Sequence, residues 1–271
     1  MMAKLWRKLS RPPLWQAGRI LFAVSAEQAF LDRAGWIITL APRSQRRSWA
    51  LRLLSLSPHY FTYQWDERYS GKSRAEVMEA EHARNAMSRR AICDRLLRPY
   101  LKPGMTVLDF GCGPGYLAAE VGKHVAKVLA IDISRGTLAC ACELNNAPNV
   151  HYVSNHLPDL RTIRDASIDF LYSIAVIQHL EKAMTSRFFS EFARVLKPRA
   201  RALCHFILGP DAPPAPPWKL WFNLRMTYYT QQEIEEMAKH AGFRGVSVAP
   251  AGQLAEIDDD VGRQHVALLE R

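Results

Sequence analysis

Short apolar runs alternate with longer amphipathic stretches from residue 105 to residue 271. The apolar runs have the length and β-branched content of buried strands, and the amphipathic stretches have the apolar periodicity of helices. Strands are predicted at 105–110, 128–133, 150–154, 168–173, 201–208, 246–248 and 265–269, and helices at 117–125, 136–145, 188–196 and 230–241. Strands that alternate with helices favour an α/β fold with a doubly wound parallel sheet and right-handed crossovers.

The first 60 residues have a different pattern, in which apolar and basic positions are mixed. We interpret residues 1–60 as a basic amphipathic N-terminal extension. Helices are predicted at 18–34 and 49–56, with a loop over the arginine-rich residues 43–47.

An aromatic stretch and a long helix connect this extension to the sheet. The helix is predicted over 76–97 and ends ahead of Pro99, because proline cannot continue a helix. Residues 61–98 are therefore predicted to form a helical lid or lead-in, and residues 99–271 the main domain. That domain carries an insertion at 209–229, which opens on a segment too rich in proline for regular structure.

The composition is that of an ordinary globular protein, with 48% apolar and 23% charged residues among 271. The longest apolar runs are far too short to cross a bilayer. The first residues lack the apolar core and cleavage site of a secretory signal, so we expect a cytoplasmic protein.

The net charge of +10 is concentrated at the N-terminus. Residues 1–52 hold ten basic and two acidic side chains, so this segment carries most of the excess. One interpretation is peripheral contact of residues 1–52 with an anionic membrane, or with nucleic acid. The alternative is a set of helices that pack on the main domain and expose a basic face.

The five cysteines form neither a zinc site nor a disulfide framework, because their number is odd and their spacing matches no metal motif. No metal is expected. Cys112 is interpreted as a small residue that suits a tight turn, and the free thiols agree with a reducing compartment.

The motif that carries the chemistry follows the first predicted strand. Residues 107–116 read Val-Leu-Asp-Phe-Gly-Cys-Gly-Pro-Gly-Tyr, with three glycines at alternate positions after an acid. Glycine permits a sharp turn and lets a ligand approach backbone N–H groups at the start of the next helix. A dinucleotide fingerprint places its third glycine one residue later, which argues against a dinucleotide oxidoreductase. The next strand ends near Asp132, where a carboxylate can bind both hydroxyls of a ribose.

The words Val-Leu-Asp-Phe-Gly-Cys-Gly-Pro-Gly and Ala-Ile-Asp-Ile-Ser resemble those of the class I S-adenosylmethionine-dependent methyltransferases. The resemblance covers roughly residues 95–271 and is most specific over 105–135. It implies a mostly parallel seven-stranded sheet with an antiparallel last strand, and S-adenosyl-L-methionine as cofactor. The cofactor-binding residues that it implies are Asp109, Gly111, Cys112, Gly113, Gly115, Asp132, Ile133, Asn155, His156, Ser173 and Ile174. Asn155 departs from the aspartate common in the family, but its amide oxygen can still accept a hydrogen bond from adenine.

The resemblance also implies where an acceptor would lie. Gln178 and His179 follow the fourth strand, and His179 has the pKa range of a general base for a hydroxyl acceptor. The alternative for His179 is a histidine at the rim of the pocket. The aromatic candidates for a lid and an acceptor pocket are Trp65, Tyr69, Trp221 and Tyr228, and the alternative for them is packing between segments. His205, on the fifth strand, is expected to be a satisfied sheet residue.

The function that fits these features is in-line methyl transfer to a small-molecule or lipid-linked acceptor, at a hydroxyl oxygen. The fourth strand is not followed by the Asp/Asn-Pro-Pro-aromatic word of amino-group base methylation, nor by the thiol of a cytosine-C5 enzyme, so no DNA substrate is expected. Two alternatives stay open: a non-catalytic binding module with this fold, and an RNA methyltransferase recruited by the basic N-terminus.

Overall fold

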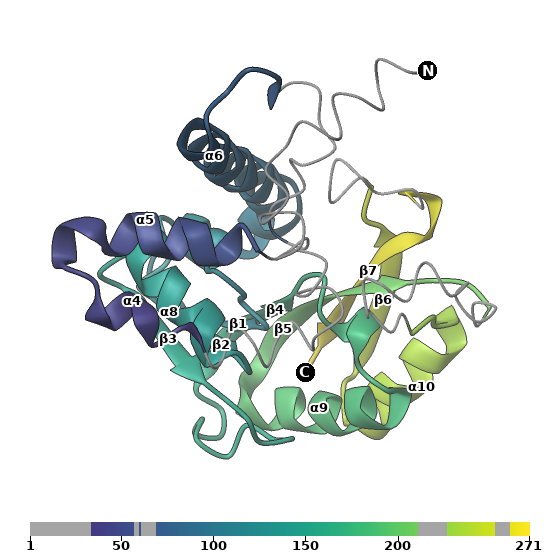
Figure 1. Ribbon diagram of the computed structural model, residues 1–271. Coiled ribbons are helices and arrows are strands. Elements are labelled where there is room, and N and C mark those ends of the chain that lie inside the picture. Colours follow the sequence, from purple (N-terminus) through teal and green to yellow (C-terminus); the bar gives the residue numbers. More distant parts are fainter. Residues whose placement is uncertain (1–33, 57–59, 61–68, 211–226, 253–260) are drawn as a thin grey trace, which may run out of the picture.

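The computed structural model describes residues 34–56, 60, 69–210, 227–252 and 261–271. A single seven-stranded sheet forms its centre, with the strand order β3-β2-β1-β4-β5-β7-β6 (Figure 1). Its strands are β1 (Thr106–Phe110), β2 (Lys127–Asp132), β3 (Val150–Ser154), β4 (Ile168–Ser173), β5 (Leu196–Ile207), β6 (Gly245–Pro250) and β7 (Gln264–Glu270). The first five strands run parallel, and β7 lies antiparallel between β5 and β6. The predicted α/β fold and the antiparallel last strand are confirmed.

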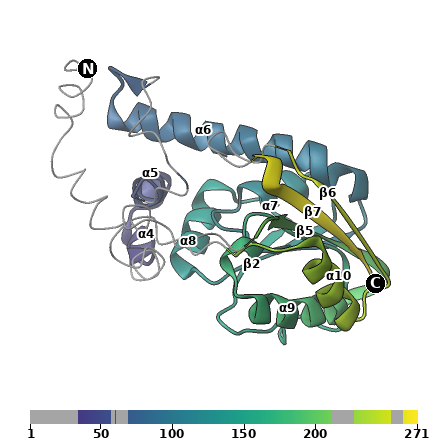
Figure 2. The ribbon, with the colours of Figure 1, turned by 90° about the vertical axis from the view of Figure 1, so that its right-hand side faces the viewer.

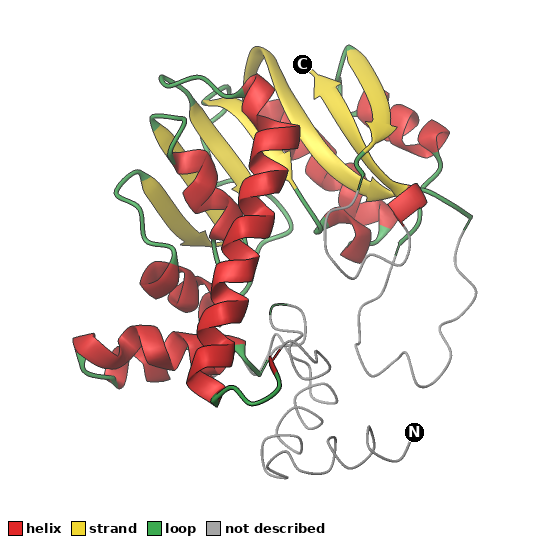
Figure 3. Cartoon of the chain, turned by 90° about the horizontal axis from the view of Figure 1, so that it is seen from above, coloured by secondary structure: helices red, strands yellow, loops and turns green. Residues whose placement is uncertain are grey.

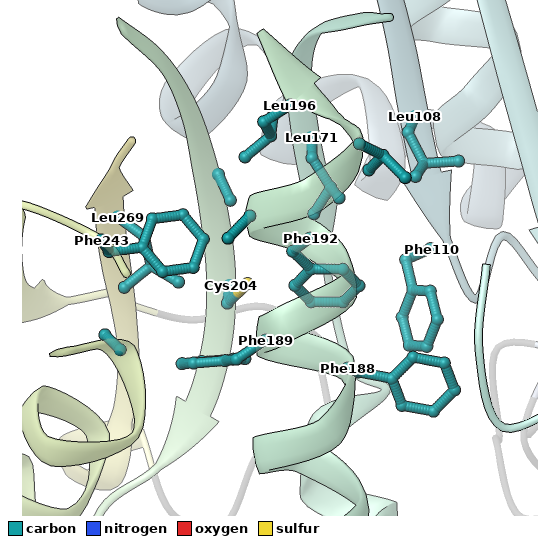
Figure 4. Close-up of a cluster of buried hydrophobic side chains, with 14 of the residues drawn as sticks. Leu108, Phe110, Leu171, Phe188, Phe189, Phe192, Leu196, Cys204, Phe243 and Leu269 are labelled. Carbon is teal, nitrogen blue, oxygen red and sulfur yellow. The ribbon is translucent and has the colours of Figure 1, made fainter. Parts of the chain in front are cut away.

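Helices cover both faces of the sheet, and each face has its own apolar core (Figures 1 and 2). The helices that alternate with the strands are α7 (Tyr116–Gly122), α8 (Arg135–Leu144), α9 (Lys182–Val195) and α10 (Gln231–His240). Phe188, Phe189 and Phe192 on α9 pack edge-on against aromatic rings of the sheet and its flank (Figure 4). Burying such a ring contributes roughly 1.5–3 kcal/mol to the stability of the fold. These contacts hold α9 against the sheet that carries the site.

The long helix α6 (Arg74–Ile92) lies across the opposite face of the sheet (Figure 3). It begins at a capping box in which Ser73 and Glu76 satisfy each other's backbone N–H groups. It then passes into the π-helical turn η3 (Cys93–Leu97) and the 3-10 turn η4 (Arg98–Tyr100). The helix predicted over 76–97 is therefore present, but its α-helical part ends at Ile92 and the turns that follow continue through Pro99 to Tyr100.

Two helices precede α6, namely α4 (Ile37–Leu40) and α5 (Arg43–Leu54). The prediction of a loop over 43–47 was wrong, because α5 begins at Arg43, directly after Pro42. Arginine has a high helix propensity, and the Arg46 guanidinium donates to the carbonyls of Thr39 and Ala41 at the end of α4. The apolar side of α5 packs against α8. The helix predicted over 18–34 lies outside the described residues.

None of the helices in the described part of the chain combines the length and the apolar character needed to cross a bilayer.

Candidate functional site

The sheet brings the glycine motif and the end of β4 together at one edge. The chain winds outward in opposite directions from β1 and β4, which are neighbours in the sheet. Ligands of open α/β sheets bind at such a switch point, beyond the carboxyl ends of the strands. The glycine motif leaves β1 at this edge, and the 3-10 turn η5 (Ile177–His179) follows β4.

All three glycines of the motif have left-handed backbone angles, with φ of +81° at Gly111, +53° at Gly113 and +79° at Gly115. A Cβ atom at Gly111 would lie 2.3 Å from Cγ2 of Val176, and one at Gly115 would lie 2.2 Å from the hydroxyl oxygen of Tyr152. These two positions are closed by the protein's own side chains. At Gly113 the nearest atom to a Cβ would be the Tyr60 hydroxyl oxygen at 3.3 Å. Gly113 is therefore the glycine that offers bare backbone to a ligand.

The N–H groups of this loop donate within the fold, which corrects the expectation that they meet a ligand. Those of Gly111 and Cys112 both donate to the carbonyl oxygen of Ile131, and that of Gly115 donates to the carbonyl oxygen of Cys112. The N–H of Gly113 donates to Oδ2 of Asp132 at 2.8 Å. These hydrogen bonds link the loop rigidly to β2, and the N–H groups that make them are not available to a ligand.

Asp132 lies at the carboxyl end of β2, as predicted. Its Oδ1 accepts from the N–H of Ser134 at 2.8 Å, while Oδ2 binds Gly113. Two backbone donors therefore fix the carboxylate beside the glycine loop, as the ribose site of a nucleoside cofactor requires.

Apolar and polar side chains surround the ends of β2 and β3. Ile133 and Leu157 are 52% and 42% exposed. Asn155 donates from its side-chain nitrogen to the carbonyl of Asp159, an arrangement that turns its amide oxygen elsewhere. His156 is exposed, and its Nε2 contacts Arg135 and Ser154. Leu157 had no signal in the sequence beyond its position two residues after Asn155.

Asp109 lies beneath the loop, in the interior of the sheet. Its Oδ2 accepts a hydrogen bond from the Tyr172 hydroxyl at 2.8 Å. Burial raises the pKa of Asp109 to about 8, although the Tyr172 hydrogen bond opposes this shift and the charge of Asp132 adds to it. The carboxyl group is therefore mostly neutral at pH 7.

Cys112 behaves as the small turn residue that was predicted. Its thiol is buried, and burial raises its pKa well above the usual range. All five cysteines are free, and a thiol of raised pKa is a poor nucleophile.

The end of β4 is tied to both neighbouring strands. Ser173 is fully buried and donates from Oγ to the carbonyl of Phe110 on β1, so its side chain belongs to the sheet. Ile174 is half-buried and packs against the core beneath β1. Gln178 is 9% exposed, and no described group donates to its enclosed Oε1. His179 is half-buried, with its N–H donating to the carbonyl of Val176.

The predicted lid and pocket aromatics divide into three groups. Trp65 and Trp221 lie outside the described residues. Tyr69 is buried and donates to Oε1 of Glu81 on α6, so the structure brings it to the helix core and not to the glycine loop. Tyr228 lies half-buried near Gly209, with the Arg263 guanidinium over its ring.

Tyr60 is the residue that sequence reasoning missed. Its hydroxyl lies over Gly113, and Nδ2 of Asn85 on α6 donates to its backbone carbonyl at 2.7 Å. Its place in the aromatic stretch that begins at residue 59 was the only signal, and nothing there distinguished it from its neighbours.

The known proteins that this chain matches include methyltransferases. Residues 108–204 match the family model described as a methyltransferase domain. The chain is 27% identical over 194 residues to the S-adenosylmethionine-dependent methyltransferase UmaA of Mycobacterium tuberculosis, which covers 68% of this chain and 59% of that protein. It is 31% identical over 119 residues to the ubiquinone/menaquinone biosynthesis C-methyltransferase UbiE of Campylobacter jejuni, which covers 40% of this chain and 47% of that protein. The chain thus spans less than two thirds of these relatives.

Solved structures agree on the fold. An S-adenosylmethionine-dependent methyltransferase from Mesorhizobium loti superposes with a TM-score of 0.54 at 19% identity, covering 66% of this chain and 98% of that one. A phosphoethanolamine N-methyltransferase 2 from Haemonchus contortus, solved with S-adenosyl-L-methionine, gives 0.52 at 19% identity, covering 69% and 56%. The strand order, the glycine loop tied to Asp132 and the match over residues 108–204 identify this part of the chain as a class I S-adenosylmethionine-dependent methyltransferase domain.

Proposed function

We propose that this protein transfers the methyl group of S-adenosylmethionine to a hydroxyl oxygen of a small-molecule or lipid-linked acceptor. The observation that carries the proposal is the hydrogen bond from Gly113 to Asp132, because it joins a bare glycine surface to a fixed carboxylate. Methionine and ribose are adjacent parts of the donor, so a site for one must lie beside a site for the other.

The residues of this edge fit the donor part by part. The glycine loop, supported from below by Asp109, would hold the methionine moiety, with Ser173 and Ile174 across from it. Asp132 would bind the ribose hydroxyls. Ile133 and Leu157 would flank the adenine, and the Asn155 amide oxygen would accept from its amino group, with His156 adjacent. Tyr60, held by Asn85, would close over Gly113.

The bound donor supplies an electrophilic methyl group on a sulfonium, and the protein's task is alignment and the exclusion of water. A hydroxyl acceptor must lose a proton as the new bond forms. His179 is our proposed general base, because a half-buried imidazole follows β4 at the edge where the glycine loop leaves β1. Gln178, on the same turn, and the aromatic residues Trp65, Trp221 and Tyr228 are the proposed acceptor contacts, whereas Tyr69 belongs to the helix core.

Support for the acceptor class comes from the names of similar proteins. The UbiE relative is named for ubiquinone and menaquinone biosynthesis, and the Haemonchus protein for phosphoethanolamine. Neither name refers to a protein or nucleic-acid substrate. A small or lipid-linked acceptor is therefore the class to test first.

A second proposal concerns residues 1–52, which we infer contact an anionic membrane surface from the cytoplasmic side. In the described part of this segment, Trp36 and Leu40 are 58% and 67% exposed on α4. The adjoining α5 has four arginines and no acidic residue, of which Arg46 and Arg47 pair with Glu143 and Glu79. Exposed apolar residues beside basic ones are typical of interfacial helices. We also propose the division of the chain predicted from the sequence: an extension of residues 1–60, a lead-in of residues 61–98 and a main domain of residues 99–271.

Cosedimentation tests the membrane proposal. The full chain should bind vesicles that contain phosphatidylglycerol, lose that binding in high salt, and ignore pure phosphatidylcholine. The variant W36A/L40A should bind more weakly. Equal binding to both vesicle types, or none, would reject this contact.

Two measurements test the enzymatic proposal. Thermal unfolding should shift upward with S-adenosylhomocysteine and stay unchanged with NADH. Incubation with labelled S-adenosylmethionine and a metabolite extract should then yield a labelled small molecule or lipid that releases its label as methyl iodide on heating with hydriodic acid, as O-methyl groups do and C-methyl groups do not. Transfer of label only to RNA would show that the acceptor is RNA and not a small molecule or lipid. Stabilisation by NADH alone would show that the donor is not S-adenosylmethionine.

A further inference from the structure

The turn between β4 and η5 contains a strained alanine. Ala175 has a φ of +60°, in the left-handed region. Any residue with a Cβ is disfavoured there, and Ala175 is exposed, so burial of its side chain does not hold it in place. A specific contact must stabilise this conformation.

That contact comes from a histidine on the neighbouring strand. His205 on β5 is 1% exposed, and its Nδ1 lies 3.2 Å from the backbone nitrogen of Ala175. A backbone N–H can only donate, so Nδ1 must be the unprotonated ring nitrogen. The proton of a neutral ring is then on Nε2, which faces Oε1 of Gln264 on β7.

Strands β5 and β7 and the turn at Ala175 thus define a single tautomer. An amide oxygen accepts, so Gln264 requires the proton on Nε2, in agreement with what Ala175 requires of Nδ1. Burial lowers the pKa of His205 to about 4, and the nearby His179 and His265 act in the same direction. The ring is satisfied on both nitrogens, as expected from the sequence, but one of the bonds serves the turn and not the sheet.

The turn at Ala175 positions two parts of the site, the glycine loop and η5. The residue after Ala175 is Val176, whose side chain packs directly on Gly111 of the glycine loop. The carbonyl of Val176 accepts from the N–H of His179 and so closes η5. A change in the backbone at Ala175 would move both contacts.

We propose that His205 is a positioning residue, which holds the left-handed turn at Ala175 through Nδ1 while Gln264 sets its tautomer. It thereby keeps Val176 on the glycine loop and η5 beside the acceptor. This role rests on the proposed function for its consequence on cofactor binding, but the tautomer and the turn are properties of the protein alone.

The first experiment needs no ligand. Nuclear magnetic resonance of the full chain with 15N-labelled histidine should show His205 with a protonated Nε2 and a bare Nδ1 at pH 7. The Ala175 amide should exchange slowly in the wild type and faster in His205→Leu. A protonated Nδ1, or an Ala175 amide that exchanges as fast in the wild type as in the variant, would overturn the proposal.

The second experiment tests whether His205 affects cofactor binding through the backbone conformation of Ala175. His205→Leu should weaken binding of S-adenosylhomocysteine about tenfold, since the turn loses its acceptor while keeping the strain of an alanine. Adding Ala175→Gly should restore most of the affinity, because glycine adopts this conformation freely. His205→Asn, whose side-chain oxygen can approach the place of Nδ1, should lose less than His205→Leu.

Ala166 offers a matched control. It is also an exposed alanine with a positive φ, +46°, but it precedes β4 at the opposite end of the strand, and its N–H donates to the carbonyl of Arg194. Ala166→Gly should not restore the affinity of His205→Leu. Equal rescue by both glycines would show that general stability is at issue and would reject the proposal. If the wild type itself does not bind S-adenosylhomocysteine, the proposed function fails, and the exchange of the Ala175 amide still decides the role of His205.

Discussion

Tyr172 and Asp109 face each other across the β1–β4 pair, and the tyrosine hydroxyl donates to the carboxyl group of Asp109 at 2.8 Å. Both side chains are buried beneath the glycine loop. Burial disfavours the carboxylate more than the hydrogen bond favours it, so the pKa of Asp109 rises to about 8. The loop is therefore supported by a largely neutral acid at pH 7.

Asp109→Asn should stabilise the protein at high pH. The folded state holds a proton on Asp109 up to about pH 8, whereas the unfolded chain releases it near the ordinary value of 3.8. The unfolded state thus binds fewer protons between these values, and stability falls as pH rises through them. Asparagine removes this loss, and the gap of about four pKa units corresponds to an expected gain of roughly 5 kcal/mol in unfolding free energy at pH 8 and little gain at pH 4. Urea unfolding at pH 4, 6 and 8 measures it.

Tyr172→Phe provides the opposite change in the same pair. Without its hydroxyl the carboxylate loses a donor, so the pKa of Asp109 should rise further and stability should keep falling above pH 8. If the wild type and Asp109→Asn lose stability in parallel from pH 4 to pH 8, Asp109 does not titrate as described.

Gly113 and Gly115 should respond differently to alanine. In Gly113→Ala the added Cβ would meet the Tyr60 hydroxyl oxygen at a tight 3.3 Å, which a small shift of that side chain relieves, so the change should cost only about 1–2 kcal/mol of stability, mainly from its left-handed φ. It should nevertheless weaken S-adenosylhomocysteine binding at least tenfold, because the bare surface is lost. Gly115→Ala would place its Cβ against the Tyr152 ring and should lower the melting temperature much more. Calorimetric titration and thermal unfolding separate the two effects, and equal losses of stability in both variants would contradict this assignment.

Tyr60→Ala should weaken S-adenosylhomocysteine binding with a small effect on stability, because the ring lies over Gly113 and is only half-buried. Tyr60→Phe keeps the ring and should retain most of the affinity. The matched change Tyr69→Phe removes a hydroxyl bonded to Glu81 within the helix core and should lower stability without altering affinity. An unchanged dissociation constant in Tyr60→Ala would remove this residue from the site.

His179→Ala should reduce turnover by about a hundredfold or more if the imidazole is the general base, with unchanged affinity for S-adenosylhomocysteine. The production of S-adenosylhomocysteine in the presence of an active extract measures turnover. Unaltered turnover would exclude His179 as the base and favour an acceptor that needs none.

Periodicity predicted the strands and the flanking helices, because each strand is a compact apolar run bounded by turn residues, whereas the antiparallel last strand was implied by the family resemblance. The glycine motif and Asp132 were likewise predictable, since their chemistry depends on residues close together in sequence. Boundaries were less accurate. Strand β5 begins at Leu196, directly after α9, although the strand was predicted only from residue 201. Strand β4 (Ile168–Ser173), in contrast, has the predicted bounds, although the apolar run continues beyond it.

Contacts between distant segments could not be predicted. The Asp109–Tyr172 bond depends on the register of two strands separated by 63 positions. The tautomer of His205 depends on Ala175 and on Gln264, each on a different element. The position of Tyr60 over Gly113 requires α6 to lie across the sheet, and no local pattern encodes that placement.

The most direct measurement is calorimetric titration of the full chain with S-adenosylhomocysteine, for the wild type and for Asp132→Ala. We predict one site per chain with micromolar affinity in the wild type, and loss of measurable binding in the variant, whose glycine loop and ribose site both lose their carboxylate. Equal affinity in the two proteins, or no binding to the wild type, would contradict a donor site built from Gly113 and Asp132.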